Sequence, residues 1–439
     1  SSPAGSARSV RSKSSSTGPS TVQSKAGGPS SAKAEDASRT RAATGRRISV
    51  LYDVPVRTTP FAPPARLLLG PGPSAVDPRV LAAQAQPLLG HLDPAFLSLM
   101  DDVKELLRHA FQTRNPFTLP ISGTGSAGME TAFVNFLRPG DRVVVGVNGA
   151  FGARMCEVAW KVGAEVARVV KPWGQVFRPE DFHEALHGGA PKLLAIVHAE
   201  TSTGAWQPLE GFAALAHDHG ALLLVDTVTS LGGVPVTVDA WGADVVYSGT
   251  QKCLSCPPGL APLTLSPRAL EALRARAASG PVFPSAPLPT NPTSILSWYL
   301  DLTSLEKYWG SDRVYHHTAP ISAIYGLFEA LRLVAEEGLE ARFARHARNS
   351  ALLWEGLGRM GLTPWAEEGA RLPTLNAVTV PAGVDEAAVR KALLEKHSIE
   401  IGGGLGELKG KIWRVGLMGH SSRPENVERF LAALKECLA

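Results

Sequence analysis

The sequence predicts an α/β fold, in which a mainly parallel central sheet is covered by helices and is followed by a smaller C-terminal α+β domain. Apolar runs of strand length alternate with segments of helical periodicity between about residue 97 and residue 247. The strand-like runs are apolar almost throughout, which is typical of parallel strands buried on both faces. Parallel neighbours need long crossover connections, and the helical segments between the runs supply them.

The elements of the large domain follow in order along the chain. A helix is expected over residues 97–112 and a strand over 118–122. A glycine-rich loop, Gly123-Thr124-Gly125-Ser126-Ala127-Gly128, then leads into a helix from Met129 to about Leu137. Beyond it the alternation continues, with strands at 142–147, 166–170, 193–197, 222–225 and 245–247 and helices at 154–162, 180–186 and 209–219. We expect this large domain to span residues 96–318.

A smaller domain is expected over residues 319–439. Helical patterns at 321–336 and 340–360 lead to strand signals at 377–380 and 412–416, and a last helix follows at 424–438. Ahead of the large domain, residues 48–95 predict an arm with a rigid turn, because two Gly-Pro steps stand at Gly70-Pro71-Gly72-Pro73. The proline-rich stretch 281–292 predicts an irregular loop or insertion.

Composition places most of the chain among globular proteins. Of 439 residues, 44% are hydrophobic and 19% are charged, and no apolar run has the length of a membrane span. The net charge of +4 does not indicate a nucleic-acid partner. The four cysteines favour a reducing compartment over a disulfide framework.

The first 47 residues form a different kind of sequence. They are rich in Ser, Ala, Gly and Arg and contain no acidic residue before Glu35, so we expect a disordered extension. An acid-poor start of this kind is also typical of a transit peptide. We expect a cytoplasmic protein. A mitochondrial location is the alternative if this extension is a transit peptide. The C-terminal residues do not match the Ser-Lys-Leu peroxisomal signal.

Two charged residues indicate the chemistry. Asp226 ends a buried strand, and Lys252 follows the next strand on a loop that contains Gly249. Pyridoxal phosphate needs this combination, since a carboxylate binds its pyridine nitrogen and a lysine binds its aldehyde. The glycine-rich loop at a helix start would bind the phosphate, because backbone N–H groups there lack intrahelical partners. These residues predict an enzyme that uses pyridoxal phosphate.

Two other readings of these motifs stay open but are less favoured. The glycine loop also fits the dinucleotide fingerprint of an NAD-dependent oxidoreductase, yet the acidic residue expected about 20 positions further on is absent. Asp141, the nearest acid, precedes the second strand instead of following it. Cys253 and Cys256 have metal-ligand spacing, but no second pair accompanies them, so we expect loop packing and no metal site.

Taken together, these motifs resemble the alanine–glyoxylate aminotransferases, a branch of the class V aminotransferases within the fold type I pyridoxal phosphate enzymes. The resemblance covers residues 66–438. It rests on six motifs, at residues 68–74, 111–116, 202–204, 248–252, 315–318 and 414–416.

The resemblance implies a role for each site residue. Lys252 would form the Schiff base with the cofactor and shuttle the substrate proton. Asp226 would keep the pyridine nitrogen protonated, and Arg414 would bind the substrate carboxylate. The remaining cofactor contacts would come from Thr124, Gly125, Ser126 and Gln251 at the phosphate and from Phe151, Thr201 and Val228 around the ring. Phe151 stands where mammalian members carry tryptophan, and an aromatic face suffices for stacking.

The resemblance also implies a homodimer. Tyr315 and Thr318 would reach the phosphate of the neighbouring subunit, and Gly70 would line the substrate pocket with the Gly-Pro turn. The implied reaction moves an amino group from alanine, or from serine, to glyoxylate. The alternatives are a serine–glyoxylate or serine–pyruvate aminotransferase, a lyase or desulfurase of the same fold, or a catalytically silent scaffold. The expected partners are small amino acids and oxo acids, with no nucleic acid and no membrane.

Overall fold

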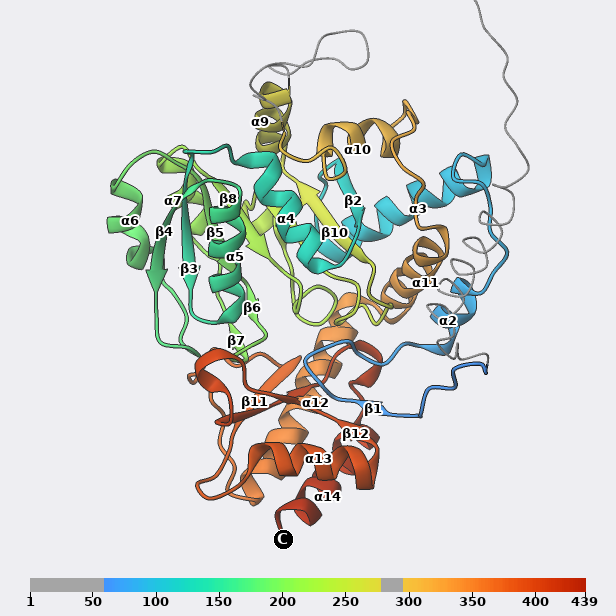
Figure 1. Ribbon diagram of the computed structural model, residues 1–439, viewed down its shortest axis with the longest axis vertical. Helices are drawn as coiled ribbons and strands as arrows, with labels where there is room; N and C mark the ends of the chain where they lie inside the picture. Colours follow the sequence, from blue (N-terminus) through green and yellow to red (C-terminus); the bar gives the residue numbers. More distant parts are fainter. Residues whose placement is uncertain (1–58, 278–294) are drawn as a thin grey trace, which may run out of the picture. The chain divides into compact units, whose positions relative to one another are not determined.

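The computed structural model describes residues 59–277 and 295–439 (Figure 1). The expected disordered extension at 1–47 and the proline-rich stretch at 281–292 lie outside the described residues. The chain divides into two units, Ser1–Pro64 and Ala65–Ala439. All elements below belong to the second unit.

A seven-stranded sheet forms the centre of the large domain. Its strands lie in the order β2-β10-β9-β8-β5-β3-β4. All neighbouring pairs are parallel except those of β10, which is antiparallel to both β2 and β9. This confirms the predicted mainly parallel sheet. Its strands are β2 Phe117–Ser122, β3 Arg142–Val147, β4 Glu165–Val170, β5 Pro191–Val197, β8 Leu222–Asp226, β9 Val245–Tyr247 and β10 Leu260–Leu265.

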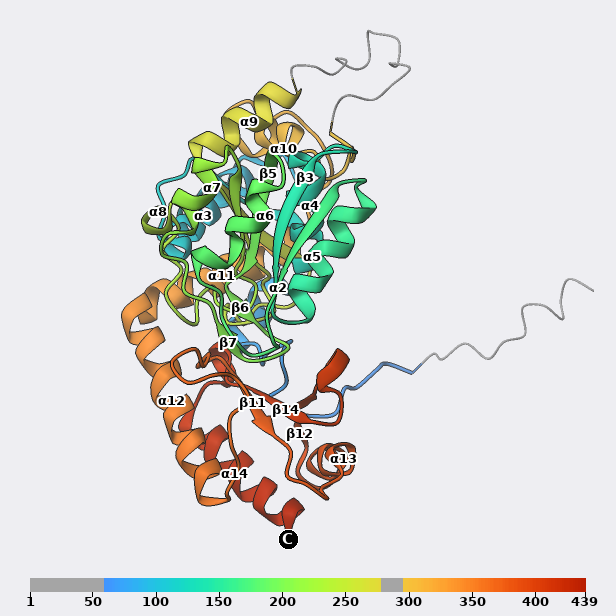
Figure 2. The same cartoon turned by 90° about the vertical axis from the view of Figure 1, so that its left-hand side faces the viewer.

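Helices cover both faces of this sheet (Figure 2). The chain moves along the sheet in one direction from β2 through β3 to β4, and then back through β5, β8 and β9. Because crossovers between parallel strands are right-handed, the connections of the two halves lie on opposite faces. Helices α4 Gly125–Phe136 and α5 Ala150–Lys161 accordingly lie on one face, and α6 His183–His187, α7 Phe212–Asp218 and α8 Val238–Trp241 on the other.

Five more helices belong to the large domain or lead to the small domain. They are α2 Pro78–Gln84, α3 Pro94–Phe111, α9 Pro267–Ala277, α10 Leu302–Trp309 and α11 Ile321–Glu337. The buried residues of α3 and α11 belong to the same apolar core as the sheet. Helix α11 therefore packs with the large domain, although it begins after residue 318, where we expected the small domain to start.

The small C-terminal domain has its own core. A three-stranded antiparallel sheet in the order β11-β14-β13 packs with helices α12, α13 and α14. Leu69 packs in this core as well, because β1 pairs in parallel with β12. The elements are β1 Leu67–Leu68, α12 Leu339–Arg359, β11 Leu375–Thr379, α13 Glu386–His397, β12 Ile399–Glu400, β13 Gly402–Gly403, β14 Ile412–Gly416 and α14 Pro424–Leu438.

Short elements join these parts. β6 Ala199–Glu200 and β7 Ala205–Trp206 form a small hairpin after β5. The 3-10 turns are η2 Pro179–Phe182, η3 Gly406–Leu408 and η4 Gly419–Ser421. Among the described residues, no helix is both long and apolar enough to cross a membrane.

Candidate active site

The strand ends bring the predicted site residues to one edge of the sheet. Strands β3, β5, β8 and β9 are parallel, and β2 has the same direction because β10 is antiparallel to both β2 and β9. The carboxyl ends of all five strands therefore point the same way, and ligands bind at that edge in open α/β sheets. The loops after them carry Thr124, Phe151, Thr201, Val228 and Lys252.

Asp226 ends β8 and is buried, with 3% of its surface exposed. Its Oδ1 accepts from the backbone N–H of Val228 at 2.8 Å, and its Oδ2 accepts from the hydroxyl of Tyr247 at 2.7 Å. Burial raises the pKa of the carboxyl to about 6, although both hydrogen bonds act against this shift. A buried carboxylate of this kind is stabilised by a cation beside it.

Lys252 lies on the loop after β9 and is 8% exposed. Its Nζ donates to the carbonyl of Pro71, in the Gly-Pro turn. Ser74 fixes the backbone, because its Oγ donates to the Lys252 carbonyl at 2.7 Å. Burial, and secondly the charge of Arg414, lower the pKa of the Lys252 amine from 10.5 to about 8.

This shift predicts how the free protein takes up a reactive aldehyde. Only the neutral amine is a nucleophile, and a lowered pKa means that it is present above about pH 8 and lost below it. Loading of pyridoxal phosphate onto the free protein should therefore accelerate as pH rises, with a midpoint near 8, measured from the absorbance of the bound cofactor. A midpoint near 10.5, the ordinary value, would contradict the burial of this amine.

The phosphate end of the site is formed by two loops in close contact. Helix α4 begins at Gly125, and its N-cap, Thr124, makes no side-chain capping bond. A methyl group on Gly125 would lie 3.2 Å from Cγ2 of Val228 and 3.6 Å from Cα of Gly249. The buried Oε1 of Gln251 has no hydrogen-bond partner among the described residues. The uncapped N–H groups at this helix start would donate to an added phosphate, whereas the Oε1 of Gln251 can only accept, so Gln251 would reach a phosphate through its other amide atom, Nε2.

A buried carboxylate holds the loop that carries Phe151. Oε2 of Glu200 accepts from the backbone N–H groups of Phe151 at 3.1 Å and Gly152 at 3.3 Å, at the start of α5. Its Oε1 accepts from the backbone N–H of Ser202 at 3.1 Å. Burial raises the pKa of Glu200. The guanidinium of Arg154 lies over the Phe151 ring, 4.8 Å from its centre.

Arg414 comes from the small domain, in β14, and points its guanidinium at the large domain. Nε donates to the carbonyl of Gly403 at 2.7 Å, and Nη1 donates to the carbonyl of Thr201 at 3.3 Å. Nη2 finds no acceptor in the described part of the chain. Burial lowers the pKa of Arg414 to about 10. The side chain remains a cation at neutral pH and has a donor available for an anionic group.

The Gly-Pro turn connects Lys252 with Arg414. Gly402 pairs with Arg414 in the small sheet, and a methyl group on Gly402 would lie 2.5 Å from Cδ of Pro71. Pro71 thus packs against the strand beside Arg414 while its carbonyl accepts from Lys252. Two groups 162 residues apart in sequence, Lys252 and Arg414, therefore meet at one turn.

The turn predicts different outcomes for two alanine substitutions. Gly72 has a φ of +101°, and a Cβ there would lie 2.5 Å from Nζ of Lys252, whereas the nearest atom to a Cβ on Gly70 is 3.8 Å away. Gly72→Ala should lower kcat by about 10–100-fold, since displacing a reacting group by about 1 Å has this effect. Gly70→Ala should leave the absorbance of the bound cofactor unchanged and raise only KM for the amino donor. Equal losses of kcat in both variants would contradict this account.

Two of the predicted site residues, Tyr315 and Thr318, do not lie at this edge of the sheet in their own chain. Tyr315 is 56% exposed, in the loop between α10 and α11, and its ring lies 5.1 Å from that of His91. Thr318, in the same loop, is exposed. Three site residues escaped the sequence analysis, namely Ser74, Glu200 and Tyr247. The sequence signal for Tyr247 was its place at the end of β9, level with Asp226 in the neighbouring strand.

Two cysteines follow Lys252 closely in the sequence. Cys253 and Cys256 are buried, and burial raises their thiol pKa values to about 11 and about 12. Such thiols are poor nucleophiles and poor metal ligands at neutral pH. Within residues 59–277 and 295–439, no group of three or more His, Cys, Asp or Glu is arranged to hold a metal ion.

The residues at this edge fit pyridoxal phosphate. The buried carboxylate of Asp226 would bind the pyridine nitrogen, the Lys252 amine with its lowered pKa would bind the aldehyde, and the uncapped start of α4 would bind the phosphate. A mainly parallel sheet with these groups at its carboxyl edge defines a fold type I pyridoxal phosphate-dependent enzyme. Residues 79–409 match the family described as aminotransferase class-V, and the chain belongs to this family.

Similar proteins agree with this membership. The alanine–glyoxylate aminotransferase of Mus musculus is 42% identical over 383 residues, which cover 86% of this chain and 89% of the relative. The (S)-ureidoglycine–glyoxylate transaminase of Bacillus subtilis is 41% identical over 379 residues, 85% of this chain and 91% of the relative. The crystal structure of alanine–glyoxylate aminotransferase from Nostoc sp. has a TM-score of 0.82 at 51% identity, covering 88% of this chain and 99% of that one. This chain is a pyridoxal phosphate-dependent transaminase.

Proposed function

We propose that this enzyme transfers an amino group from alanine to glyoxylate, giving pyruvate and glycine. One observation carries the proposal for the site: the turn at Pro71 brings the Lys252 amine and the Arg414 guanidinium to the same place. An amino acid has its carboxylate next to the carbon that loses a proton. A fixed cation beside a neutral amine suits such a substrate.

Each residue has a separate task in this reaction. Pyridoxal phosphate, when bound, supplies a ring that withdraws the electron pair of the broken Cα–H bond. Asp226 would bind the pyridine nitrogen and keep it protonated. Lys252 would take the proton from the substrate Cα and hold it for the return transfer. Thr124, Gly125, Ser126 and Gln251 would hold the phosphate, and Phe151, Thr201 and Val228 would lie around the ring.

Arg414 orients both substrates. Donor and acceptor react in turn at one site, and each presents a carboxylate, so each would use the same available nitrogen, Nη2. Arginine can bind the carbonyls of Gly403 and Thr201 with Nε and Nη1 while it presents Nη2 to the substrate, and a lysine ammonium cannot reproduce this geometry. The Gly70–Gly72 turn limits the space beside the reacting carbon, which favours alanine or serine over larger donors.

A panel of amino donors tests this specificity. Steady-state rates with glyoxylate should be highest for alanine, with serine as the nearest alternative, and low for aspartate and aromatic amino acids. (S)-Ureidoglycine belongs in the panel because the Bacillus subtilis relative uses it. A higher kcat/KM for (S)-ureidoglycine or aspartate than for alanine would refute alanine as the donor, while the transaminase assignment would stand.

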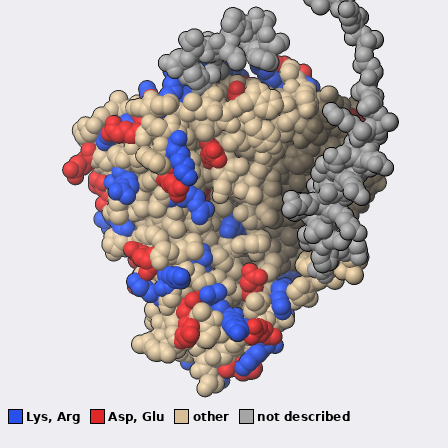
Figure 3. Space-filling model, viewed as in Figure 1, with Lys and Arg blue, Asp and Glu red and all other residues tan. Residues whose placement is uncertain are grey.

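We propose that the active enzyme is a homodimer in which Tyr315 and Thr318 complete the site of the partner. Several large apolar side chains are exposed around these two residues: Leu88 at 68%, Leu92 at 46%, Trp298 at 71% and Val314 at 52%. The surface over β2 and β10 carries almost no charged residues in the view of Figure 3. An exposed apolar patch of this kind is typical of an interface, and a second copy of the chain is its proposed occupant.

Hybrid dimers test this sharing. A Lys252→Ala subunit and a Tyr315→Ala/Thr318→Ala subunit would each form weak or inactive homodimers. In a mixed dimer, one site combines both defects and the other is intact if Tyr315 and Thr318 act across the interface. Mixing the two variants should then restore about a quarter of the wild-type rate for random pairing. No restoration in mixtures shown to contain hybrids would place these residues in their own subunit's site.

A further inference from the structure

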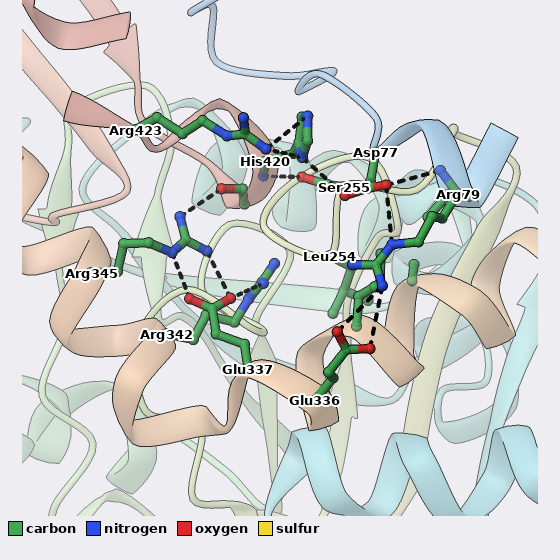
Figure 4. A pocket seen from close by; sticks show the side chains of 14 residues that line it. Asp77, Arg79, Leu254, Ser255, Glu336, Glu337, Arg342, Arg345, His420 and Arg423 are labelled. Atoms are coloured by element: carbon green, nitrogen blue, oxygen red, sulfur yellow. Dashed lines mark hydrogen bonds and ion pairs between the residues drawn. The ribbon is translucent and has the colours of Figure 1, made fainter. Parts of the chain in front are cut away.

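A pocket of about 360 Å³ lies behind the loop of Lys252, where α2, α11, α12 and the small domain meet (Figure 4). Charged side chains from both domains dominate its walls. They are Asp77, Arg79, Glu336, Glu337, Arg342, Arg345, His420 and Arg423. Leu254 and Ser255, two and three residues after Lys252, also line the pocket, together with Val80, Ala330, Leu333 and Gly419.

The arginines of this pocket are used for protein contacts. Arg345 binds the two oxygens of Glu337 at 2.5 and 2.9 Å. Its third nitrogen donates to the carbonyls of Gly419 at 2.9 Å and Ser422 at 2.6 Å. Arg79 pairs with Glu336 at 3.3 Å. The cluster therefore joins segments of the chain and offers few free donors to a ligand.

Arg342 is the best buried of these arginines, with 6% of its surface exposed. Nε donates to the carbonyl of Gly232 at 2.8 Å, and Nη2 donates to the carbonyl of Cys253 at 2.6 Å. Nη1 binds the carboxylate of Glu337 at 2.6 Å. Cys253 directly follows Lys252, and Gly232 lies in the loop that follows Asp226. One guanidinium thus binds both segments that carry the reactive groups.

Other hydrogen bonds also hold the loop of Lys252, but their donors are neutral and each reaches only one loop. The backbone N–H of Ser74 donates to the carbonyl of Gln251 at 2.9 Å, and that of His420 donates to Oγ of Ser255 at 2.8 Å. These neutral bonds each fix one point of one loop. Arg342 makes charge-assisted bonds, which are about twice as strong as neutral ones. It also connects α12, which enters the small domain, to both loops at once.

We propose that Arg342, held by Glu337, is a positioning residue for Lys252: it fixes the carbonyl of Cys253, the residue after the lysine, and thereby keeps the amine buried against the Pro71 carbonyl. This inference rests on the proposed role of Lys252. Without the anchor, the loop would shift toward solvent. The amine would then regain hydration and its ordinary basicity, and it would sit less accurately at the substrate Cα.

Arg342→Lys is the direct test, with Arg345→Lys as the matched control. Both variants keep the charge and disturb the same Glu337, but Arg345 donates to Gly419 and Ser422 and to neither loop of the site. In Arg342→Lys, the pH midpoint for loading pyridoxal phosphate should rise by about half a unit or more. The kcat should fall about tenfold with little change in KM for alanine. Arg345→Lys should shift neither the midpoint nor kcat by more than about twofold.

Several outcomes would overturn this inference. An unchanged midpoint and kcat in Arg342→Lys would do so, as would equal changes in both variants, because Arg342 would then act only on stability. If Arg342→Lys does not fold, Glu337→Gln keeps the packing and weakens the hold on Arg342, and it should shift the midpoint in the same direction. Failure of the proposed function is separable, since borohydride would then tag no lysine, or a different one, in the unaltered enzyme.

Discussion

Lys252→Ala is expected to lower kcat by at least about 10³-fold, because the group that moves the substrate proton is lost. The amine lies buried against Pro71 with a pKa of about 8, which suits a proton acceptor near neutral pH. The measurement is a single-turnover assay with alanine on the variant supplied with pyridoxal phosphate. The variant should still bind the cofactor, through the phosphate contacts at the start of α4.

A matched control separates chemistry from folding in this variant. Removing the Lys252 side chain takes the donor from the Pro71 carbonyl and one cation from the surroundings of the buried Asp226, and bound cofactor would supply a cation to Asp226 in its place. The melting temperature should stay within a few degrees of the wild type. A small primary amine added to the solution should restore part of the rate, since it can take the proton in place of Lys252. Wild-type turnover in Lys252→Ala without added amine would contradict the assignment.

Asp226→Asn is expected to lower kcat by about 10²–10³-fold, the effect of losing a buried ionic contact worth about 3–5 kcal/mol. Asparagine keeps the shape and removes the charge that holds a proton on the pyridine nitrogen. The rate of Cα proton exchange, followed with deuterated alanine, measures this step directly.

The control for Asp226 is its neighbour in β9. Tyr247→Phe removes the hydroxyl that donates to Oδ2 but leaves the carboxylate. Its effect should be about 10–100-fold and smaller than that of Asp226→Asn, since one hydrogen bond to a charged group contributes about 1.5–3 kcal/mol. Near-normal Cα proton exchange in Asp226→Asn would contradict the proposed role of Asp226. A larger loss of the exchange rate in Tyr247→Phe than in Asp226→Asn would contradict it as well.

Most of the fold could be predicted from the sequence because buried parallel strands are continuous apolar runs. The strands at 142–147 and 412–416 and the last helix at 424–438 agree with β3, β14 and α14 residue for residue. Strand β10 was not predicted. It carries Pro262 in the middle of the sheet, facing Pro120 of β2, and a proline that cannot donate argues against a central strand.

The helix starts show a second limit. Helix α4 begins at Gly125 and α5 at Ala150, each about one turn before the predicted starts at Met129 and Arg154. In both cases the first turn belongs to the site, at the phosphate loop and at the loop of Phe151. Glycines and small residues there carry no apolar periodicity, so the pattern that reveals a helix begins only after them.

The sequence predicts those parts of the candidate site in which a charged side chain has a chemical role. It does not predict those in which a backbone carbonyl holds a side chain in place. Asp226 and Lys252 stand out because they end or follow apolar strands, and Arg414 stands out because it lies within one. The carbonyls of Pro71, Cys253 and Gly232 have no sequence signal, since every residue has a carbonyl. Glu200 looks like an ordinary loop acid, and only the fold shows that it holds the start of α5.

Reduction of the enzyme with borohydride, followed by peptide mapping, tests the central claim most directly. The reagent fixes the cofactor to the lysine that carries it, so the label reports the reactive amine without reference to rates. The account predicts one labelled peptide per chain, with the label on Lys252, and none when alanine has first converted the cofactor to its amino form. A label on any other lysine, or no label on enzyme that transaminates, would contradict the account.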